Sequence, residues 1–250
     1  MSENTSDRIG KLIGIGVGPG EPKYLTVEAI LALKEAARVV APCANNLEVG
    51  RAEATVLRAI EEGYLSEVSI DRVIIPMDGS STNAYRDAAQ NIAISLREGL
   101  DVALITLGDP HLYSTFTSFS AEIKKLIPSL IIETVPGIMA FQALASRFSL
   151  VLSDQEEALY LVTAHNSKTK LLEALDTANT SVVIYKGGRE FPSIIDELKK
   201  RNRLSESIAG EKLGMDGEFL GSVDAFEGRD VGYLATMIVP PVRHENKEES

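Results

Sequence analysis

The chain has 250 residues, of which 44% are hydrophobic, and its formal net charge is −11 at pH 7. This length and apolar content suffice for one large hydrophobic core or two modest ones. The acidic balance argues against a nucleic-acid partner, because affinity for phosphates depends on lysine and arginine neutralising the backbone charge.

The cysteine content and the hydropathy pattern are typical of a cytoplasmic protein. Cys43 is the only cysteine, so an intrachain disulfide is excluded. Residues 1–8 are polar and contain no apolar signal segment, and no apolar run approaches the roughly 20 residues of a membrane span. Three histidines and one cysteine offer little material for a metal site. We therefore expect neither a membrane anchor nor a protein-built metal site.

Short apolar runs alternate with amphipathic helical patterns through the first half of the chain. The expected strands are Lys11–Val17, Arg38–Ala41, Arg72–Ile75, Asp101–Thr106 and Ile131–Val135. Helices are expected after the cap residue Thr26, over about 50–62, from Thr82 or Asn83 to Gly99, and up to about Ile127. This alternation implies right-handed crossovers, so the first half is predicted to be an α/β lobe with a mostly parallel sheet.

The turn Pro136-Gly137 marks the expected boundary between two lobes, residues 1–136 and 137–250. The second lobe is predicted to hold the strands Leu159–Thr163, Ser181–Tyr185, Glu206–Gly210, Glu218–Val223 and Gly232–Val239. Its helices are expected at about Lys168–Leu175 and Pro192–Arg201. The last three strands follow one another without helices, which predicts a mixed sheet with antiparallel pairs. A basic cluster is expected to be the solvated end of a helix: Lys199, Lys200, Arg201 and Arg203.

Three unusual loops follow expected strands, and ligands bind outside the carboxyl ends of the strands in a parallel α/β sheet. The first loop, Gly14–Gly20 (GIGVGPG), lets the backbone approach a ligand, although a plain tight turn is an alternative. Pro19 takes the place of the third glycine of a dinucleotide-binding fingerprint. The second loop, Thr106–Thr115 (TLGDPHLYST), contains Asp109, a partner for an ammonium group or the cap of an Asx turn. The third, Thr134–Ala140 (TVPGIMA), is a binding loop or a domain junction.

In this order, the motifs GVGPGEPKYLT, TLGDPHLYSTF and ETVPGIMAF resemble those of the tetrapyrrole (class III) methyltransferases. The resemblance runs from about Lys11 to Val239, and the GDPxLYSTF form is most like the enzymes that methylate C20 of precorrin-2 or cobalt-precorrin-2. The segment IYKGGRE stands where those enzymes usually carry a K-x-G-R pattern. Three features depart from the family: Lys186 stands where relatives often have an apolar residue, Gly188 replaces the usual residue before Arg189, and the stretch Gly210–Phe219 is atypically rich in glycine.

The resemblance implies an α/β fold of two lobes with the cofactor cleft between them, assembled as a homodimer. It also implies S-adenosylmethionine as the methyl donor and a tetrapyrrole of the corrin (cobalamin) route as the substrate, with any cobalt arriving inside that substrate. Carried over position by position, the donor-binding residues are Pro19, Leu107, Gly108, Asp109, Leu112, Met139, Ala140, Tyr185, Lys186, Ala235 and Thr236. Because the substrate carries several carboxylates, cations near the loops are candidates to bind it: Lys23, Arg86, Arg147, Lys186 and Arg189. For Arg86 and Arg147 we favour an ordinary solvated surface charge.

The base that takes the proton from the methylated carbon stays open. Asp109, His111 and Tyr113 are geometrically plausible, and so are solvent or a substrate carboxylate; a loop histidine without a role is as good an interpretation of His111.

The sequence leaves three rival functions: a class III methyltransferase with another acceptor (another precorrin carbon or a diphthamide type), a nucleotide-dependent oxidoreductase, and a non-catalytic tetrapyrrole-binding protein. The oxidoreductase needs an acidic residue at the end of the second strand, where this chain has Ala41-Pro42-Cys43.

Overall fold

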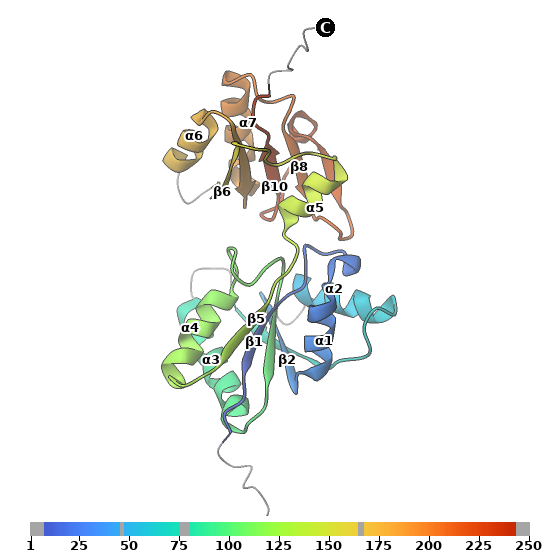
Figure 1. Cartoon of the computed structure of the whole chain (residues 1–250), viewed down its shortest axis with the longest axis vertical. Helices are drawn as coiled ribbons and strands as arrows, with labels where there is room; N and C mark the ends of the chain where they lie inside the picture. Colours follow the sequence, from blue (N-terminus) through green and yellow to red (C-terminus); the bar gives the residue numbers. More distant parts are fainter. Residues whose placement is uncertain (1–7, 46–47, 76–80, 165–167, 244–250) are drawn as a thin grey trace, which may run out of the picture. The chain divides into compact units, whose positions relative to one another are not determined.

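The computed structural model describes residues 8–45, 48–75, 81–164 and 168–243. The chain divides into two compact units, Met1–Met139 and Ala140–Ser250, and each is built on its own five-stranded sheet (Figure 1). The division falls just beyond the turn at Pro136. Across the described ranges, no helix is both long enough and apolar enough to cross a membrane.

The sheet of the N-terminal unit is entirely parallel, with strand order β3-β2-β4-β1-β5. Its strands are β1 (Leu12–Gly16), β2 (Arg38–Cys43), β3 (Ile70–Ile74), β4 (Val102–Thr106) and β5 (Ile132–Val135). Its helices are α1 (Val27–Glu35), α2 (Arg51–Glu61), α3 (Ser81–Arg97) and α4 (Phe116–Leu126), with a short 3-10 turn η1 (Pro22–Tyr24). The expected parallel α/β lobe is confirmed.

Two of the expected helix starts have different outcomes. Thr26 caps α1 as expected, since its Oγ1 accepts a hydrogen bond from the backbone N–H of Ala29 at 3.0 Å. The next expected cap was wrong: α3 already begins at Ser81, so Thr82 and Asn83 lie within the helix instead of capping it.

The alternation of side chains along the strands decides which helices cover which face of this sheet. Val40 and Leu104 point to the core formed with α3 and α4, whereas Val39 and Ile105 point to the core formed with α1 and α2. Figure 1 shows these two pairs of helices on opposite sides of the sheet. All five residues of β4 are buried, because this strand has a neighbour on each side and helices on both faces.

The sheet of the C-terminal unit is mixed, with strand order β6-β7-β10-β8-β9, which confirms the second half of the fold prediction. Its strands are β6 (Ala158–Thr163), β7 (Thr180–Tyr185), β8 (Ile208–Glu211), β9 (Phe219–Ser222) and β10 (Thr236–Val239). The pair β6–β7 is parallel, and the other pairs are antiparallel. The final strand is shorter than expected, because 232–235 precede it as turn and coil.

Helices α6 (Lys168–Asp176) and α7 (Phe191–Lys200) pack against one face of this sheet, where they share a core with Val182, Ile184 and Met237. Helix α5 (Ala140–Arg147) packs against β10. Two short 3-10 turns, η2 (Gly188–Glu190) and η3 (Val223–Phe226), complete the unit.

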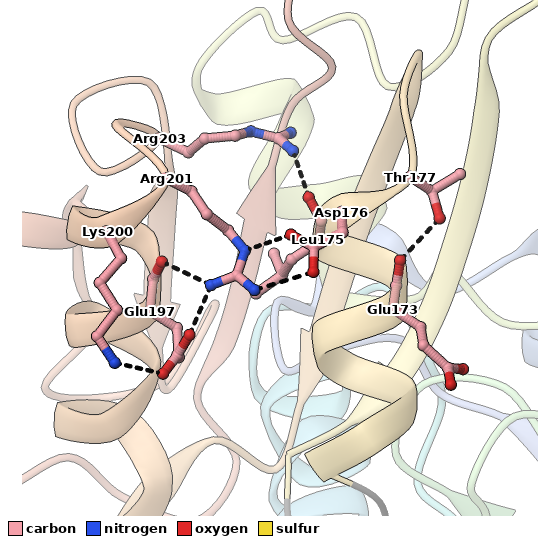
Figure 2. Close-up of polar contacts among 8 residues, drawn as sticks. All are labelled: Glu173, Leu175, Asp176, Thr177, Glu197, Lys200, Arg201 and Arg203. Atoms are coloured by element: carbon pink, nitrogen blue, oxygen red, sulfur yellow. Dashed lines mark hydrogen bonds and ion pairs between the residues drawn. The ribbon is translucent and has the colours of Figure 1, made fainter.

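One member of the basic cluster after α7 is buried, so the expectation of a solvated helix end was wrong for it. Only 7% of Arg203 is exposed. Its Nη1 donates to the carbonyl of Leu175 at 3.2 Å and its Nη2 donates to the carbonyl of Pro240. Figure 2 shows the first of these contacts. Burial lowers the pKa of this guanidinium, which nevertheless satisfies carbonyls of the last turn of α6 and of the chain that leaves β10.

Its neighbour Arg201 makes contacts of a different kind, with carboxylates (Figure 2). Its Nε donates to Asp176 Oδ1 at 2.7 Å and its Nη1 donates to Glu197 Oε2 at 2.5 Å. The hydrogen bond from Arg201 lowers the pKa of Asp176, and hydrogen bonds from Lys200 and Arg201 lower the pKa of Glu197. A carboxyl group with a lowered folded-state pKa contributes stability above its ordinary pKa and loses that contribution as the pH falls through the folded-state value.

We predict that Arg203→Met lowers the free energy of unfolding by about 2–4 kcal/mol, because two buried carbonyls lose their donor. Carbonyls do not titrate, so this loss should be the same at neutral pH and at about pH 3. Urea unfolding at both pH values measures it.

Arg201→Met is the matched control for this prediction. Its cost should be largest at neutral pH and smaller at about pH 3, because Asp176 and Glu197 of the wild type become protonated as the pH falls toward their lowered folded-state pKa values. The same pH dependence for both variants would contradict the distinction between the two arginines.

Candidate functional site

The strand order of the N-terminal sheet brings the three unusual loops together. Strand β1 lies between β4 and β5, with Gly16 paired with Thr106 and Ile15 paired with Val135. Because the three strands are parallel and in register at their ends, the chain leaves all of them at the same edge of the sheet. Loops that begin near residues 17, 107 and 136 are therefore neighbours in space.

The first and second loops are joined through two glycines. The N–H of Gly108 donates to the carbonyl of Gly18 at 2.8 Å, and the N–H of Gly18 donates to the carbonyl of Gly108 at 3.4 Å. Gly18 has a φ of 76° and Gly108 a φ of 72°, in the left-handed region that glycine adopts without a steric penalty. The glycines at these two positions are thus required by the backbone geometry of the loop pair.

The third loop approaches the other two so closely that a side chain would not fit. A Cβ atom on Gly137 would lie 2.0 Å from the carbonyl oxygen of Gly108, and one on Gly16 would lie 2.7 Å from the nitrogen of Gly137. Gly16, Gly108 and Gly137 therefore form a backbone junction of the three loops, here called the glycine junction.

Side chains reinforce the contact between the second and third loops. Asp109 Oδ1 accepts a hydrogen bond from the N–H of His111 at 2.8 Å, and Oδ2 accepts one from the N–H of Gly137 at 3.0 Å. The ring of His111 is exposed, and its Nε2 lies 3.0 Å from Thr134 Oγ1 on β5. Both oxygens of Asp109 are thus engaged with the backbone.

The second loop is also fixed at its far end. Ser114 Oγ lies 2.8 Å from Thr106 Oγ1 and accepts from the N–H of Phe116 at 3.0 Å. Tyr113 has a φ of 51°, which is unusual for an aromatic residue and points to a local constraint. Partial burial raises the pKa of its phenol, so Tyr113 is protonated near neutral pH and is better suited to donate a proton than to accept one.

The backbone of the second loop has open space beside it. A Cβ atom on Gly108 would meet no other atom within 4 Å. Of the other expected donor-binding residues in this unit, Pro19 is buried. The remaining ones are half-buried: Leu107, Asp109, Leu112 and Met139. A ligand can therefore approach the backbone at Gly108 from the side away from the glycine junction.

The remaining expected donor-binding residues lie together in the C-terminal unit. Tyr185, at the end of β7, is paired with Thr236, at the start of β10. Lys186 follows with a φ of 57°, and the N–H of Gly187 donates to the carbonyl of Ala235 at 3.4 Å. Thr236 Oγ1 is buried and, among the residues that the structure describes, has no hydrogen-bond partner. Ala140 is the first residue of α5, and the ring of the second residue, Phe141, contacts the ring of Tyr185.

The five candidate cations have different surroundings. Arg147 Nη2 lies 3.6 Å from Glu218 Oε2, which agrees with a surface ion pair. The ammonium group of Lys186 lies 5.6 Å from the centroid of the Tyr233 ring. The side chains of the other three are exposed: Lys23, Arg86 and Arg189.

A hollow of about 930 Å³ lies along β3, and none of the loop residues lines it. Its arginines are already paired with carboxylates: Arg38 with Asp71 at 2.8 Å, and Arg72 with Glu53 at 2.8 Å. Because these arginines are already neutralised and none of the three loops reaches this hollow, the loops remain the candidate site.

Similarity to known proteins identifies the family of this chain. The family model of the tetrapyrrole (corrin/porphyrin) methylases matches residues 11–225. The chain belongs to this family.

The relatives and structures similar to this tetrapyrrole methylase cover nearly its whole length. A precorrin-2 C(20)-methyltransferase from Sinorhizobium sp. is 28% identical over 247 residues, 93% of this chain and 96% of the relative. A cobalt-precorrin-2 C(20)-methyltransferase from Salmonella typhimurium is 27% identical over 238 residues, 92% of this chain and 96% of the relative. The crystal structure of a uroporphyrin-III C-methyl transferase from Thermus thermophilus complexed with S-adenyl homocysteine has a TM-score of 0.61, at 21% identity, and covers 92% of this chain and 97% of that chain.

Sequence reasoning missed one residue of this methylase that supports the first loop. Arg58 on α2 donates from Nη1 to the carbonyl of Gly20 at 3.4 Å, and its Nη2 lies 3.3 Å from Glu62. Arg58 and Gly20 are 38 residues apart, so no local pattern connects them. Ser114 and Thr134 lie within the motifs, but the sequence predicted no role for them. A threonine eight residues before a serine, as at Thr106 and Ser114, is no general motif, so their contact could not be predicted.

We predict that Gly137→Ala destabilises the protein by at least about 3 kcal/mol, because the added methyl group would collide with backbone that cannot rotate away. Gly63→Ala is the control: Gly63 has a φ of 81° and open space around it, so only the left-handed conformation is penalised, at about 1 kcal/mol. Thermal and urea unfolding compare the two. Equal costs would show that the glycine junction is looser than described.

Proposed function

We propose that this tetrapyrrole methylase transfers a methyl group from S-adenosylmethionine to C20 of precorrin-2 or cobalt-precorrin-2, in cobalamin biosynthesis. The observation that carries the proposal is the glycine junction, in a chain of this family whose relatives are named for these two substrates. Those relatives match over almost their whole length, so the proposal concerns the complete enzyme activity.

The described residues fit a methyl donor. The backbone at Gly108 is open to a ligand, and loops with close backbone packing bind cofactors through N–H and C=O groups. In the other unit, the buried hydroxyl of Thr236 has no partner in the described part of the chain and would be satisfied by a polar edge of the donor. The uroporphyrin-III C-methyl transferase of similar fold was crystallised in complex with S-adenyl homocysteine, which supports this choice of donor. We propose that both groups of residues contact the donor.

When bound, S-adenosylmethionine supplies a methyl group on a sulfonium centre that is activated for displacement. The protein then has to hold the attacking carbon in line with that methyl group and exclude water, and orientation of this kind contributes several kcal/mol to catalysis. We assign this task to the backbone at Pro19, Gly108 and Met139, and to Tyr185 and Thr236.

The proton on the methylated carbon has to leave after transfer. Tyr113 keeps its proton near neutral pH, because burial raises its pKa, and we assign it to donation of a hydrogen bond to the substrate. His111 is exposed beside the second loop and is the side chain here best placed to accept a proton. Lys23, Lys186 and Arg189 are the cations proposed to bind substrate carboxylates, because Arg147 is already paired with Glu218.

Incubation with S-adenosylmethionine and either precorrin-2 or cobalt-precorrin-2 tests the proposal. We expect a product heavier by one methyl group, and mass spectrometry of the two reactions shows which substrate is preferred. Calorimetry with S-adenosylhomocysteine should show binding without any acceptor. Donor binding without methylation of either substrate would assign the enzyme to another acceptor, and no binding at all would exclude a methyltransferase.

Two glycine variants locate the donor within the same assays. Gly108→Ala and Gly63→Ala share a positive φ and open surroundings, so both should lose about 1 kcal/mol of stability. Gly108→Ala alone should weaken S-adenosylhomocysteine binding, by about tenfold, since its methyl group would occupy space beside the donor. Equal donor affinity in both variants would place the donor away from the second loop.

We further propose that the enzyme is a homodimer, as the family resemblance implies, and that it is cytoplasmic, as its cysteine content and hydropathy pattern indicate. Exposed apolar side chains on the C-terminal unit support an interface: Phe148, Val151, Leu159, Tyr160 and Val242. We expect sedimentation at the mass of two chains. A monomer over the whole measurable concentration range would contradict the proposal.

A further inference from the structure

We propose that Asp109 is a positioning residue, which holds the third loop against the second and so sets the width of the donor pocket, and that it is not the catalytic base. This inference rests on the proposed function. It assigns Asp109 a role that differs from proton transfer, for which its carboxylate was one of three candidates.

The geometry of the carboxylate carries the inference. Oδ1 accepts from the N–H of His111 at 2.8 Å, within the second loop, and Oδ2 accepts from the N–H of Gly137 at 3.0 Å, in the third. Each oxygen therefore holds a backbone N–H from a different loop. A carboxylate accepts hydrogen bonds on both oxygens, and N–H donors to a charged acceptor form stronger bonds than donors to a neutral one.

The position of Asp109 in the chain adds to this effect. It directly follows Gly108, whose carbonyl oxygen is the atom that a Cβ on Gly137 would strike. Two consecutive residues thus fix Gly137 in opposite ways: the backbone of Gly108 limits how close the third loop can come, and the side chain of Asp109 limits how far it can move away. The loop that leads to Met139 is held between these limits.

A second contact also links the second loop to the strand that precedes the third loop. His111, whose backbone N–H is bound by Asp109, places its ring Nε2 3.0 Å from Thr134 Oγ1 on the strand that leads into the third loop. The carboxylate therefore also orients the residue that makes this contact.

The carboxylate of Asp109 is poorly suited to act as a catalytic base, because both of its oxygens accept hydrogen bonds from the backbone. Protonation would remove the negative charge of the carboxylate and so weaken both of its hydrogen bonds to backbone N–H groups. The loops would then loosen at the moment of catalysis, when the reacting atoms have to stay aligned.

The test compares Asp109→Asn with Asp101→Asn. An asparagine can accept only one of the two N–H bonds at position 109, because its amide nitrogen would face the second N–H. We expect Asp109→Asn to raise the Kd for S-adenosylhomocysteine about tenfold. At saturating donor, single-turnover methylation should stay within about threefold of wild type, with an unchanged pH profile.

Asp101→Asn is a close control. Asp101 Oδ1 accepts from the N–H of Lys11 at 2.8 Å, and its carboxylate also accepts from the exposed side chain of Arg8. It therefore also joins the backbone of neighbouring strands by a carboxylate, and it lies at the opposite end of the strands of the same sheet, before β4. We expect a comparable loss of thermal stability and an unchanged Kd for S-adenosylhomocysteine.

Each outcome has a distinct meaning. Wild-type affinity in Asp109→Asn, with single-turnover methylation lost, would identify Asp109 as the base and overturn the inference. Absence of S-adenosylhomocysteine binding in wild type would overturn the proposed function first, and the inference with it. If Asp109→Asn does not fold, amide hydrogen exchange of the wild-type protein decides: we expect the N–H of Gly137 to be protected, and exchange at the rate of an open loop would refute its bond to Asp109.

Discussion

The central constraint on this protein is the order of three parallel strands, β4-β1-β5. Chain segments that are far apart in sequence leave these strands at one edge of the sheet, so their loops have to share a small space. Glycine is what makes this possible, because Gly16 and Gly137 bring backbone against backbone at distances that no side chain allows. The arrangement leaves open space beside the backbone of Gly108, while β4 behind the loops is fully buried.

Ion pairs within this acidic protein reduce the number of arginines that can bind an anionic substrate. Many arginines are engaged within the protein: Arg38 with Asp71, Arg72 with Glu53, and Arg201 with Asp176 and Glu197. These pairs contribute to the packing of elements and are not available to a substrate. The cations that remain exposed near the loops are few, which limits where an anionic tetrapyrrole can be held.

The C-terminal unit depends on polar contacts as much as on its apolar core. Arg203 is buried and satisfies carbonyls of two separate segments, so that the chain leaving β10 is held against α6. At the other end of β10, the buried hydroxyl of Thr236, which pairs with Tyr185 across the sheet, has no hydrogen-bond partner among the residues described. A buried polar atom without a partner is costly, and such atoms are retained where a ligand completes them.

The sequence by itself determined the two α/β lobes, the parallel and mixed character of their sheets, the cap at Thr26 and the three loops, because these depend on local periodicity and on glycine and proline in turns. The family motifs lie on those loops, so the kind of chemistry was also predictable. Only the tertiary structure decided what individual side chains do. Asp109 bonds to Gly137, Arg58 to Gly20, and Arg203 to Leu175 and Pro240. These partners are distant along the chain, and whether a charged side chain meets solvent, a carboxylate or a backbone carbonyl is set by the packing of whole elements, which no local pattern encodes.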